Sequence, residues 1–416
     1  FGFGKMSWFG LGCCASRTTK ANLPRDSAFD KQLLDGFNRA ADAAFVRSHP
    51  SKISRKPLDG DLGLNAQFSE DHFAKKRKPV FDSTSTEKER SSGKSDKSVV
   101  MPIDPEAFNF TKVAEGEIIA VVDASQAMKP PDTSIFAGLY EVEEDPVEEV
   151  PVTVLVCASP LAMGHVLMVP RIQDKLPQAL TSELMLHGLH LMTKSTRSDF
   201  RILFNSLLGF ASVNHFHFHG LYLDYCSLST KRLPIEKVDR SVIAGGRTEG
   251  RLCIELLAET QWYTRGFVLT AGCAKGQAEK DSAPGSAPQA DLQALARLAG
   301  NIVESLQQRN IPHNVLIVPF LGERRVRKID ETIDDLKPNA ASPEVYIVPR
   351  QPEHNLRKDA GFNAAVMELS GALVAHSEES YNDFEEAKLI EIFNQDVSLS
   401  GKDFDDLICK VAWMAN

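Results

Sequence analysis

The chain has 416 residues, of which 43% are hydrophobic and 25% charged, a composition typical of a globular protein with enough core for two domains. A formal net charge of −9 argues against general binding to nucleic acids or anionic membranes, which both favour a basic surface. No apolar run approaches transmembrane length, and the seven cysteines form no CxxC pair, as is typical of reduced thiols in the cytosol. We therefore expect a cytoplasmic protein that binds neither nucleic acid nor membrane.

The N-terminal part of the chain is predicted to hold one helix between two segments without a core. Residues 1–25 are expected to be disordered, and apolar residues at helical spacing predict an amphipathic helix over 26–47. Residues 26–81 comprise this helix and a lead-in, and the basic run at 75–78 indicates a solvated surface rather than a nuclear signal. The charged, serine-rich residues 82–98 predict a low-complexity linker.

Two similar series of strands and helices follow the linker. The first is predicted to contain strands over 117–122, 152–157 and 166–169, a helix over 176–194, a strand over 200–205, a loop over 206–214 and a strand over 215–223. The second is predicted to contain a strand over 262–270, a Gly/Ala/Ser/Pro-rich insert over 274–288, a helix over 289–309, strands over 314–319 and 344–348, and helices over 381–393 and 402–413.

The parallel order of these two series indicates an internal duplication, with one half over residues 99–258 and the other over 259–416. Neither half contains a GxGxxG or GxxxxGKS/T motif, which would mark a dinucleotide-binding fold or a P-loop. Mixed strands and helices joined by hairpins therefore predict an α+β fold rather than a doubly wound sheet.

The sequence His215-Phe-His-Phe-His219 places three histidines at alternating positions in the last strand of the first series. Successive strand side chains face opposite sides, so the three histidines share one face while Phe216 and Phe218 face the other and can be buried. Each imidazole needs its own hydrogen-bond partner, so core packing alone does not explain the pattern. Two functions fit: imidazoles that ligate zinc, or a nucleophilic imidazole whose neighbours bind phosphate oxygens.

The loop ahead of the histidines favours phosphate. Residues 206–214 contain Gly209 and the small polar side chains of Ser212 and Asn214, and such a loop can offer backbone N–H groups to an anion. No further metal ligand stands at a characteristic spacing, so we expect no metal. His217, the middle imidazole, is the predicted nucleophile. The pair Gly164-His165 ends a turn before an apolar strand and is by itself interpreted as structural.

Two motifs together resemble the histidine-triad superfamily: SPLAMGHVLMVP at 159–170 and ASVNHFHFHG at 211–220. Further segments are similar to the animal GDP-D-glucose phosphorylases and the related plant GDP-L-galactose phosphorylases. These segments are DPEAFNFTKV at 104–113, FNSLLGF at 204–210, PHN at 312–314 and FNAAVMELSG at 362–371. The likeness runs from about Ser27 to the C-terminus and is interrupted by the linker, the insert and a loop at 322–342.

The resemblance implies a galactose-1-phosphate-uridylyltransferase-like fold of two related halves with antiparallel sheets and flanking helices. Only the half over 99–258 would be catalytic. The implied reaction converts GDP-glucose and phosphate into glucose 1-phosphate and GDP, without a cofactor. His217 would attack the α-phosphorus and carry the guanylyl group. A backbone carbonyl would hold its Nδ1–H and leave Nε2 free. A homodimer is also considered.

The remaining implied site residues would surround the phosphate. His215 and His219 would orient it or donate protons to its oxygens, and Ser212 and Asn214 would stabilise the developing charge. Asn205 and Gly209 complete the expected phosphate and nucleotide pocket.

Two positions depart from the family pattern. Cys157 stands where the family has an asparagine before the SP pair, and Ala372 replaces the histidine of an ELSGH sequence. Two alternatives stay open. His219, which the hydrolytic triad proteins also carry, leaves open a histidine-triad nucleotide hydrolase, in which water captures the guanylyl group. The two departures leave open a nucleotide-binding protein whose site has decayed.

Overall fold

The structure is a computed structural model that describes residues 26–70, 98–125, 149–226, 232–245, 252–271, 289–319 and 343–414. Several expectations concern segments outside these residues. They are the disordered start at 1–25, the basic run at 75–78, nearly all of the linker at 82–98, the insert at 274–288 and the loop at 322–342. Within the described ranges, no helix combines the length and the apolar character needed to cross a membrane.

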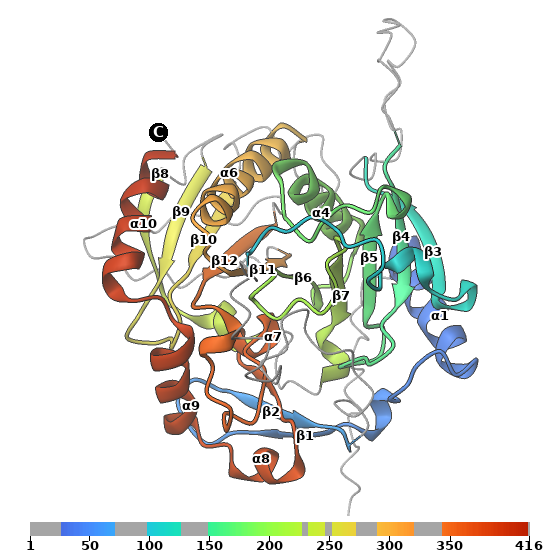
Figure 1. The fold of residues 1–416 in the computed structure, drawn as a ribbon, viewed down its shortest axis with the longest axis horizontal. Coiled ribbons are helices and arrows are strands. Elements are labelled where there is room, and N and C mark those ends of the chain that lie inside the picture. Colours follow the sequence, from blue (N-terminus) through green and yellow to red (C-terminus); the bar gives the residue numbers. More distant parts are fainter. Residues whose placement is uncertain are drawn as a thin grey trace, which may run out of the picture.

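A ten-stranded sheet forms the centre of the molecule (Figure 1), and every pair of neighbouring strands in it is antiparallel. In spatial order its strands are β3 (Ile118–Asp123), β4 (Pro151–Val156), β5 (Val166–Pro170), β7 (Phe218–Tyr222), β6 (Phe200–Asn205), β11 (His313–Val318), β12 (Glu344–Pro349), β10 (Phe267–Ala271), β9 (Leu252–Leu257) and β8 (Arg240–Gly245). The chain therefore has the predicted α+β fold with antiparallel pairing.

The strand order repeats in the two parts of the chain. Residues 118–222, here called the first unit, contribute β3-β4-β5-β7-β6, with helix α4 (Ser182–Lys194) between β5 and β6. Residues 240–414, the second unit, contribute β8-β9-β10-β12-β11, with α6 (Gln289–Gln308) in the equivalent place. The two units meet where β6 pairs with β11, so their strands form one continuous sheet.

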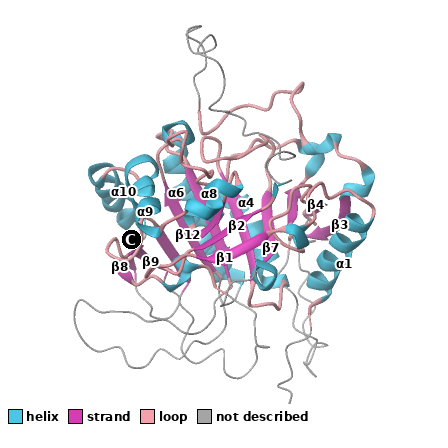
Figure 2. Ribbon diagram, turned by 90° about the horizontal axis from the view of Figure 1, so that it is seen from below, coloured by secondary structure: helices cyan, strands magenta, loops and turns pink. Residues whose placement is uncertain are grey.

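Helices cover one face of this sheet. They are α4, α6, α1 (Ala28–Asp42) and α10 (Gly401–Met414), and most of their buried apolar side chains belong to one core cluster with the sheet. The other face carries a three-stranded sheet and short helices. These are β1 (Ser54–Pro57), β2 (Asn65–Phe68), β13 (Ala372–Val374), α7 (Val366–Leu369), α8 (Glu378–Asp383) and α9 (Glu386–Ile392). In Figure 2, which views the molecule from below, β1 and β2 lie in front of the large sheet.

Several element boundaries differ from the prediction for local reasons. The helix expected from residue 176 begins at Ser182, because the Thr181 side chain caps it by accepting the N–H of Leu184 at 3.2 Å. The strand expected from residue 262 begins at Phe267. The sequence missed strands β8 and β9, and the helix expected over 381–393 is divided into α8 and α9.

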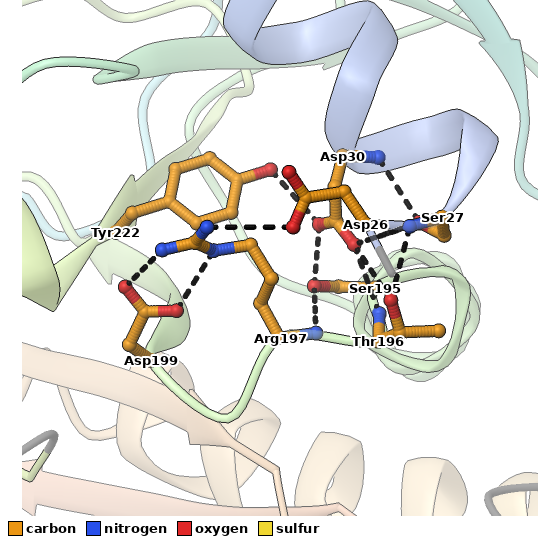
Figure 3. A network of polar contacts seen from close by, with 8 residues as sticks. All are labelled: Asp26, Ser27, Asp30, Ser195, Thr196, Arg197, Asp199 and Tyr222. Carbon is orange, nitrogen blue, oxygen red and sulfur yellow. Dashed lines mark hydrogen bonds and ion pairs between the residues drawn. The ribbon is translucent and has the colours of Figure 1, made fainter. Parts of the chain in front are cut away.

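A buried carboxylate fastens α1 to the first unit (Figure 3). Asp30 forms a capping box with Ser27 at the start of the helix, and its side chain is fully buried. It also accepts hydrogen bonds from Ser195 Oγ at 2.6 Å, the N–H of Thr196 at 3.0 Å and the hydroxyl of Tyr222 at 3.0 Å. Burial, and then the negative charge of Asp30, raise the pKa of Tyr222, so this hydroxyl stays a donor.

We expect the substitution Asp30→Ala to lower the free energy of unfolding by about 3 kcal/mol, because it leaves several buried donors without an acceptor. The measurement is the urea midpoint at constant m-value, with Asp35→Ala on the exposed face of α1 as the matched control. A loss of stability no larger than that of the control would show that Asp30 does not anchor the helix.

Candidate active site

The three predicted histidines lie where β7 begins. The expected strand over 215–223 is shorter than predicted, because only His219 belongs to β7 and the other two histidines precede it. The N–H of Phe216 donates to the carbonyl of Leu176 at 2.7 Å, and the N–H of His217 donates to Gln178 Oε1 at 2.9 Å. This stretch therefore bonds to the loop before α4 instead of to a neighbouring strand.

The predicted alternation of faces holds despite the shorter strand. Phe216 and Phe218 are fully buried, contact each other with ring centroids 5.0 Å apart, and belong to the core cluster under α4. The rings of His217 and His219 lie beside each other, with centroids 5.1 Å apart. The phenylalanines therefore fix the backbone from the helix side while the histidines share the opposite side.

The tautomer of His217 is set by the main chain. Its Nδ1 lies 2.8 Å from the carbonyl oxygen of His215, and a carbonyl can only accept, so Nδ1 carries the hydrogen. The predicted hydrogen bond is therefore confirmed, and Nε2 keeps its lone pair. Burial lowers the pKa of His217 to about 4, so the ring is neutral at physiological pH.

His215 has the opposite tautomer. Its Nδ1 accepts the N–H of Phe110 at 3.0 Å, so a neutral ring carries its hydrogen on Nε2. Burial lowers the pKa of this histidine also to about 4, and nearby Lys175 adds to the shift. The ring of Phe110 contacts both residues, with its centroid 5.4 Å from that of His215 and 5.0 Å from that of His217.

A fourth histidine orients His219. His165 Nδ1 accepts the N–H of Leu161 at 3.0 Å, so its Nε2–H donates to Nδ1 of His219, 3.0 Å away. His219 consequently carries its own hydrogen on Nε2. The sequence around Gly164-His165 predicts only a structural turn and does not reveal this role. β5 and β7 pair Leu167 with His219, which brings the two imidazoles together.

Gln178 holds the backbone around His217 and was also missed. Its Nε2 donates to the carbonyl of Asn205 at 2.9 Å and to that of His217 at 3.3 Å, while its Oε1 accepts the N–H of His217. The side chain is almost completely buried. One amide thus satisfies both main-chain groups of the predicted nucleophile.

The loop over 206–214 begins with a strained turn. Leu208 and Phe210 have φ values of 60° and 72°, which cost a bulky residue roughly 1–2 kcal/mol each. Gly209 lies between them for lack of space, since an added Cβ would come within 2.9 Å of Ser206 Oγ and 3.2 Å of the His313 carbonyl oxygen. The turn is thus a specific shape and not merely a connection.

The end of this loop offers hydrogen-bond donors. Within the part of the chain that the structure describes, the backbone N–H groups of Ser212, Val213 and Asn214 donate no hydrogen bond, and the half-buried Ser212 hydroxyl has no partner. Successive free N–H groups next to neutral imidazoles form a region suited to an anion.

The two asparagines predicted to bind phosphate or nucleotide serve the scaffold with most of their polar atoms. Asn214 accepts the N–H of Gln178 at 3.0 Å, and its Nδ2 donates to the carbonyls of Met101 and Pro102 at 3.2 and 3.0 Å. Asn214 therefore contributes its backbone N–H, not its side chain, to the loop.

Asn205 Oδ1 accepts from Asn314 Nδ2 at 2.6 Å and from the N–H of Val366 at 3.0 Å. Its side-chain oxygen is thus committed to the second unit, and the amide nitrogen is the group left for a ligand.

The two departures from the family pattern lie in different places. Cys157 follows β4, and its N–H donates to the carbonyl of His165 at 3.1 Å, so it borders the turn that orients His219. Ala372 is buried in β13, where it pairs with Asn65 of β2. Among the described residues, no group of three His, Cys, Asp or Glu side chains gathers as metal ligands would.

Comparison with known sequences assigns the chain to a family of two-domain proteins. The family model described as "GDPGP1-like, N-terminal domain" matches residues 28–221, and the one described as "GDPGP1-like, C-terminal domain" matches residues 236–415. Together they cover most of the chain, which therefore belongs to the GDPGP1-like family.

Curated relatives carry two related names. GDP-D-glucose phosphorylase 1 of Bos taurus is 26% identical over 374 residues, which cover 90% of this chain and 80% of the relative. The Danio rerio protein of that name is 24% identical, covering 95% and 93%. GDP-L-galactose phosphorylase 2 of Arabidopsis thaliana is 27% identical, covering 85% and 68%.

Among solved structures, yeast Ap4A phosphorylase Apa2 in complex with Ap4A aligns with a TM-score of 0.48 and 12% identity, over 90% of this chain and 99% of that one.

Acid should destabilise the protein through its buried histidines. Burial lowers the pKa of His187, His215, His217 and His313 to about 4 in the folded state. In the unfolded chain these histidines bind protons near pH 6.5. Their contribution to the free energy of unfolding is therefore fully present above that pH and is lost as the pH falls from 6.5 towards 4. We expect each histidine to cost roughly 1.4 kcal/mol between pH 7.5 and 5.5.

Urea midpoints at the two pH values test this expectation. His187→Gln on α4 should reduce the pH dependence by the share of one group. Equal midpoints of the wild-type protein at pH 7.5 and 5.5 would contradict it.

Proposed function

We propose that this protein is a GDP-D-glucose phosphorylase, a nucleotidyltransferase that converts GDP-glucose and phosphate into glucose 1-phosphate and GDP. Membership of the GDPGP1-like family and the curated phosphorylases that match most of the chain support the substrates. The observation that carries the mechanism is the neutral His217, whose Nδ1–H is held by the His215 carbonyl and whose Nε2 is free to attack.

In the first step, His217 Nε2 attacks the α-phosphorus of GDP-glucose. A P–N bond forms, the bond from the α-phosphorus to the bridging oxygen breaks, and glucose 1-phosphate leaves with the electron pair. The imidazole gains positive charge, which the His215 carbonyl oxygen at Nδ1 stabilises. No base is needed, because the attacking nitrogen carries no hydrogen.

The surrounding donors stabilise the negative charge that develops on the phosphate. His219 Nε2–H, set by the bond from His165, is assigned to the bridging oxygen of the leaving group. The Ser212 hydroxyl and the free N–H groups of the loop are assigned to the non-bridging oxygens. His215 supports His217 mainly through its carbonyl.

In the second step, an oxygen of inorganic phosphate attacks the α-phosphorus, the P–N bond breaks, and GDP forms while His217 is regenerated. The double displacement requires no cofactor. Water in place of phosphate would give GMP, which is the hydrolase alternative.

We also infer a galactose-1-phosphate-uridylyltransferase-like arrangement of a catalytic half and a second half, a cytoplasmic location, a homodimer, and no nucleic-acid or membrane partner. The net charge of −9 supports the last of these.

Labelled guanylate should be trapped on the protein when GDP-glucose carrying label in its guanylyl group is added without phosphate. His217→Ala should abolish the label, because it removes the nucleophile, whereas His49→Ala at an exposed position should leave it unchanged. Equal labelling of wild type and His217→Ala would show that another residue carries the group. A wild type that binds nucleotide but never becomes labelled would favour the decayed site.

Product analysis with GDP-glucose separates the phosphorylase from the hydrolase. We expect turnover to depend on phosphate and to give GDP in its presence, because phosphate and not water captures the guanylyl group. The measurement is chromatography of the nucleotide products with and without phosphate. Release of mainly GMP in both conditions would reject phosphorolysis.

A further inference from the structure

The strained turn of the candidate phosphate loop is held by the second unit. The Leu208 carbonyl accepts the N–H of Glu353 at 2.8 Å, and the Gly209 carbonyl accepts Asn314 Nδ2 at 2.9 Å. The N–H of Phe210 donates to Glu353 Oε2 at 2.8 Å. Three consecutive residues of the first unit are thus hydrogen-bonded to two residues of the second. Glu353 bonds to the residues on both sides of Gly209.

The base of the same loop is also joined to the second unit. The N–H of Ser206 donates to the His313 carbonyl at 3.1 Å, and the N–H of His313 donates back to Ser206 Oγ at 3.0 Å. Within the first unit, this turn is closed by the N–H groups of Gly209 and Ala211, which both donate to the Ser206 carbonyl. The second unit therefore supplies the contacts that hold the left-handed residues.

Glu353 is an unusual choice for such a contact. Its side chain is 4% exposed, and a buried carboxylate is expensive unless cationic and hydrogen-bonding groups compensate it. Arg350 supplies the cation: it is fully buried, its charge interacts with Glu353, and its guanidinium lies 5.1 Å from the ring centroid of Phe210. Carboxylate and guanidinium thus both act on the left-handed Phe210.

We propose that Glu353 is a positioning residue for nucleotidyl transfer, an inference that rests on the proposed function. By accepting the N–H of Phe210, its carboxylate keeps this residue in the left-handed conformation. The following residues, Ser212 to Asn214, then direct their free N–H groups towards the α-phosphate. Without the acceptor, Phe210 relaxes to the common region of backbone space and turns these donors away.

Two substitutions separate the hydrogen bond from the charge. Glu353→Gln keeps an acceptor at the right distance and removes the charge, so we expect kcat/KM for GDP-glucose to stay within about threefold of wild type. Glu353→Asp keeps the charge but is one methylene too short to reach Phe210, so we expect kcat/KM for GDP-glucose to fall about 30-fold, as in Glu353→Ala. Glu378→Ala, at an exposed glutamate of the same unit, is the matched control.

The urea midpoint of each variant is measured beside its rate. If Glu353 only stabilised the fold, the rates of the variants would follow their stabilities and not the presence of a hydrogen-bond acceptor. If Glu353→Gln were as impaired as Glu353→Ala while Glu353→Asp matched wild type, the charge and not the hydrogen bond would matter, and the proposal would be overturned. Wild-type rates in both Glu353→Ala and Glu353→Asp would overturn it as well.

Calorimetric titration with GMP keeps this proposal distinct from the proposed function. Weaker GMP binding in Glu353→Asp but not in Glu353→Gln would support the positioning role even if wild type showed no phosphorolysis of GDP-glucose. Unchanged GMP binding and transfer in Glu353→Asp, with normal phosphorolysis by wild type, would leave the proposed function intact and reject the positioning role.

Discussion

The pairing of β6 with β11 is the constraint on which the rest of the architecture depends. It joins two five-stranded units into one sheet, and it sets Asn205 directly opposite Asn314 at the point where both strands approach the site. The loop that leaves β6 after Asn205 therefore emerges beside His313 and the segment that follows β12. A register shift of one residue would turn the buried faces of both strands around and separate these contacts.

Neutral groups, and not charged side chains, set the hydrogen positions of the four histidines at the candidate site. Hydrogen bonds with main-chain carbonyl and N–H groups fix which nitrogen of His217, His215 and His165 carries the hydrogen. His165 in turn donates to Nδ1 of His219, which fixes the hydrogen of that ring on Nε2. Burial keeps His215 and His217 neutral. An anionic substrate at this site would meet dipoles that need no reorientation during a reaction, which suits a chain with net negative charge.

Local pattern predicted the parts of this site that depend on neighbours in sequence. The alternation from 215 to 219 separates histidines from phenylalanines correctly, and the carbonyl that fixes His217 lies only two residues away.

The residues that the sequence analysis missed act over long separations. Gln178 lies 39 residues from His217, His165 lies 54 from His219, and Glu353 lies 143 from Phe210. No spacing rule connects such pairs, because only the assembled sheet brings them together. The predicted strand start at residue 215 was wrong for the same reason: β7 begins at 218 because the residues before it bond to the loop ahead of α4.

The repeated strand order has a consequence for how such proteins diverge. If the second unit takes no part in the chemistry, as proposed for this protein, it is free to specialise in supporting it, and its contacts with the 206–211 turn are of that kind. The presence of the histidines alone is then not enough to predict that such a protein is active. A homologue could keep every histidine and still lose its reaction through substitutions in the half that carries none of them.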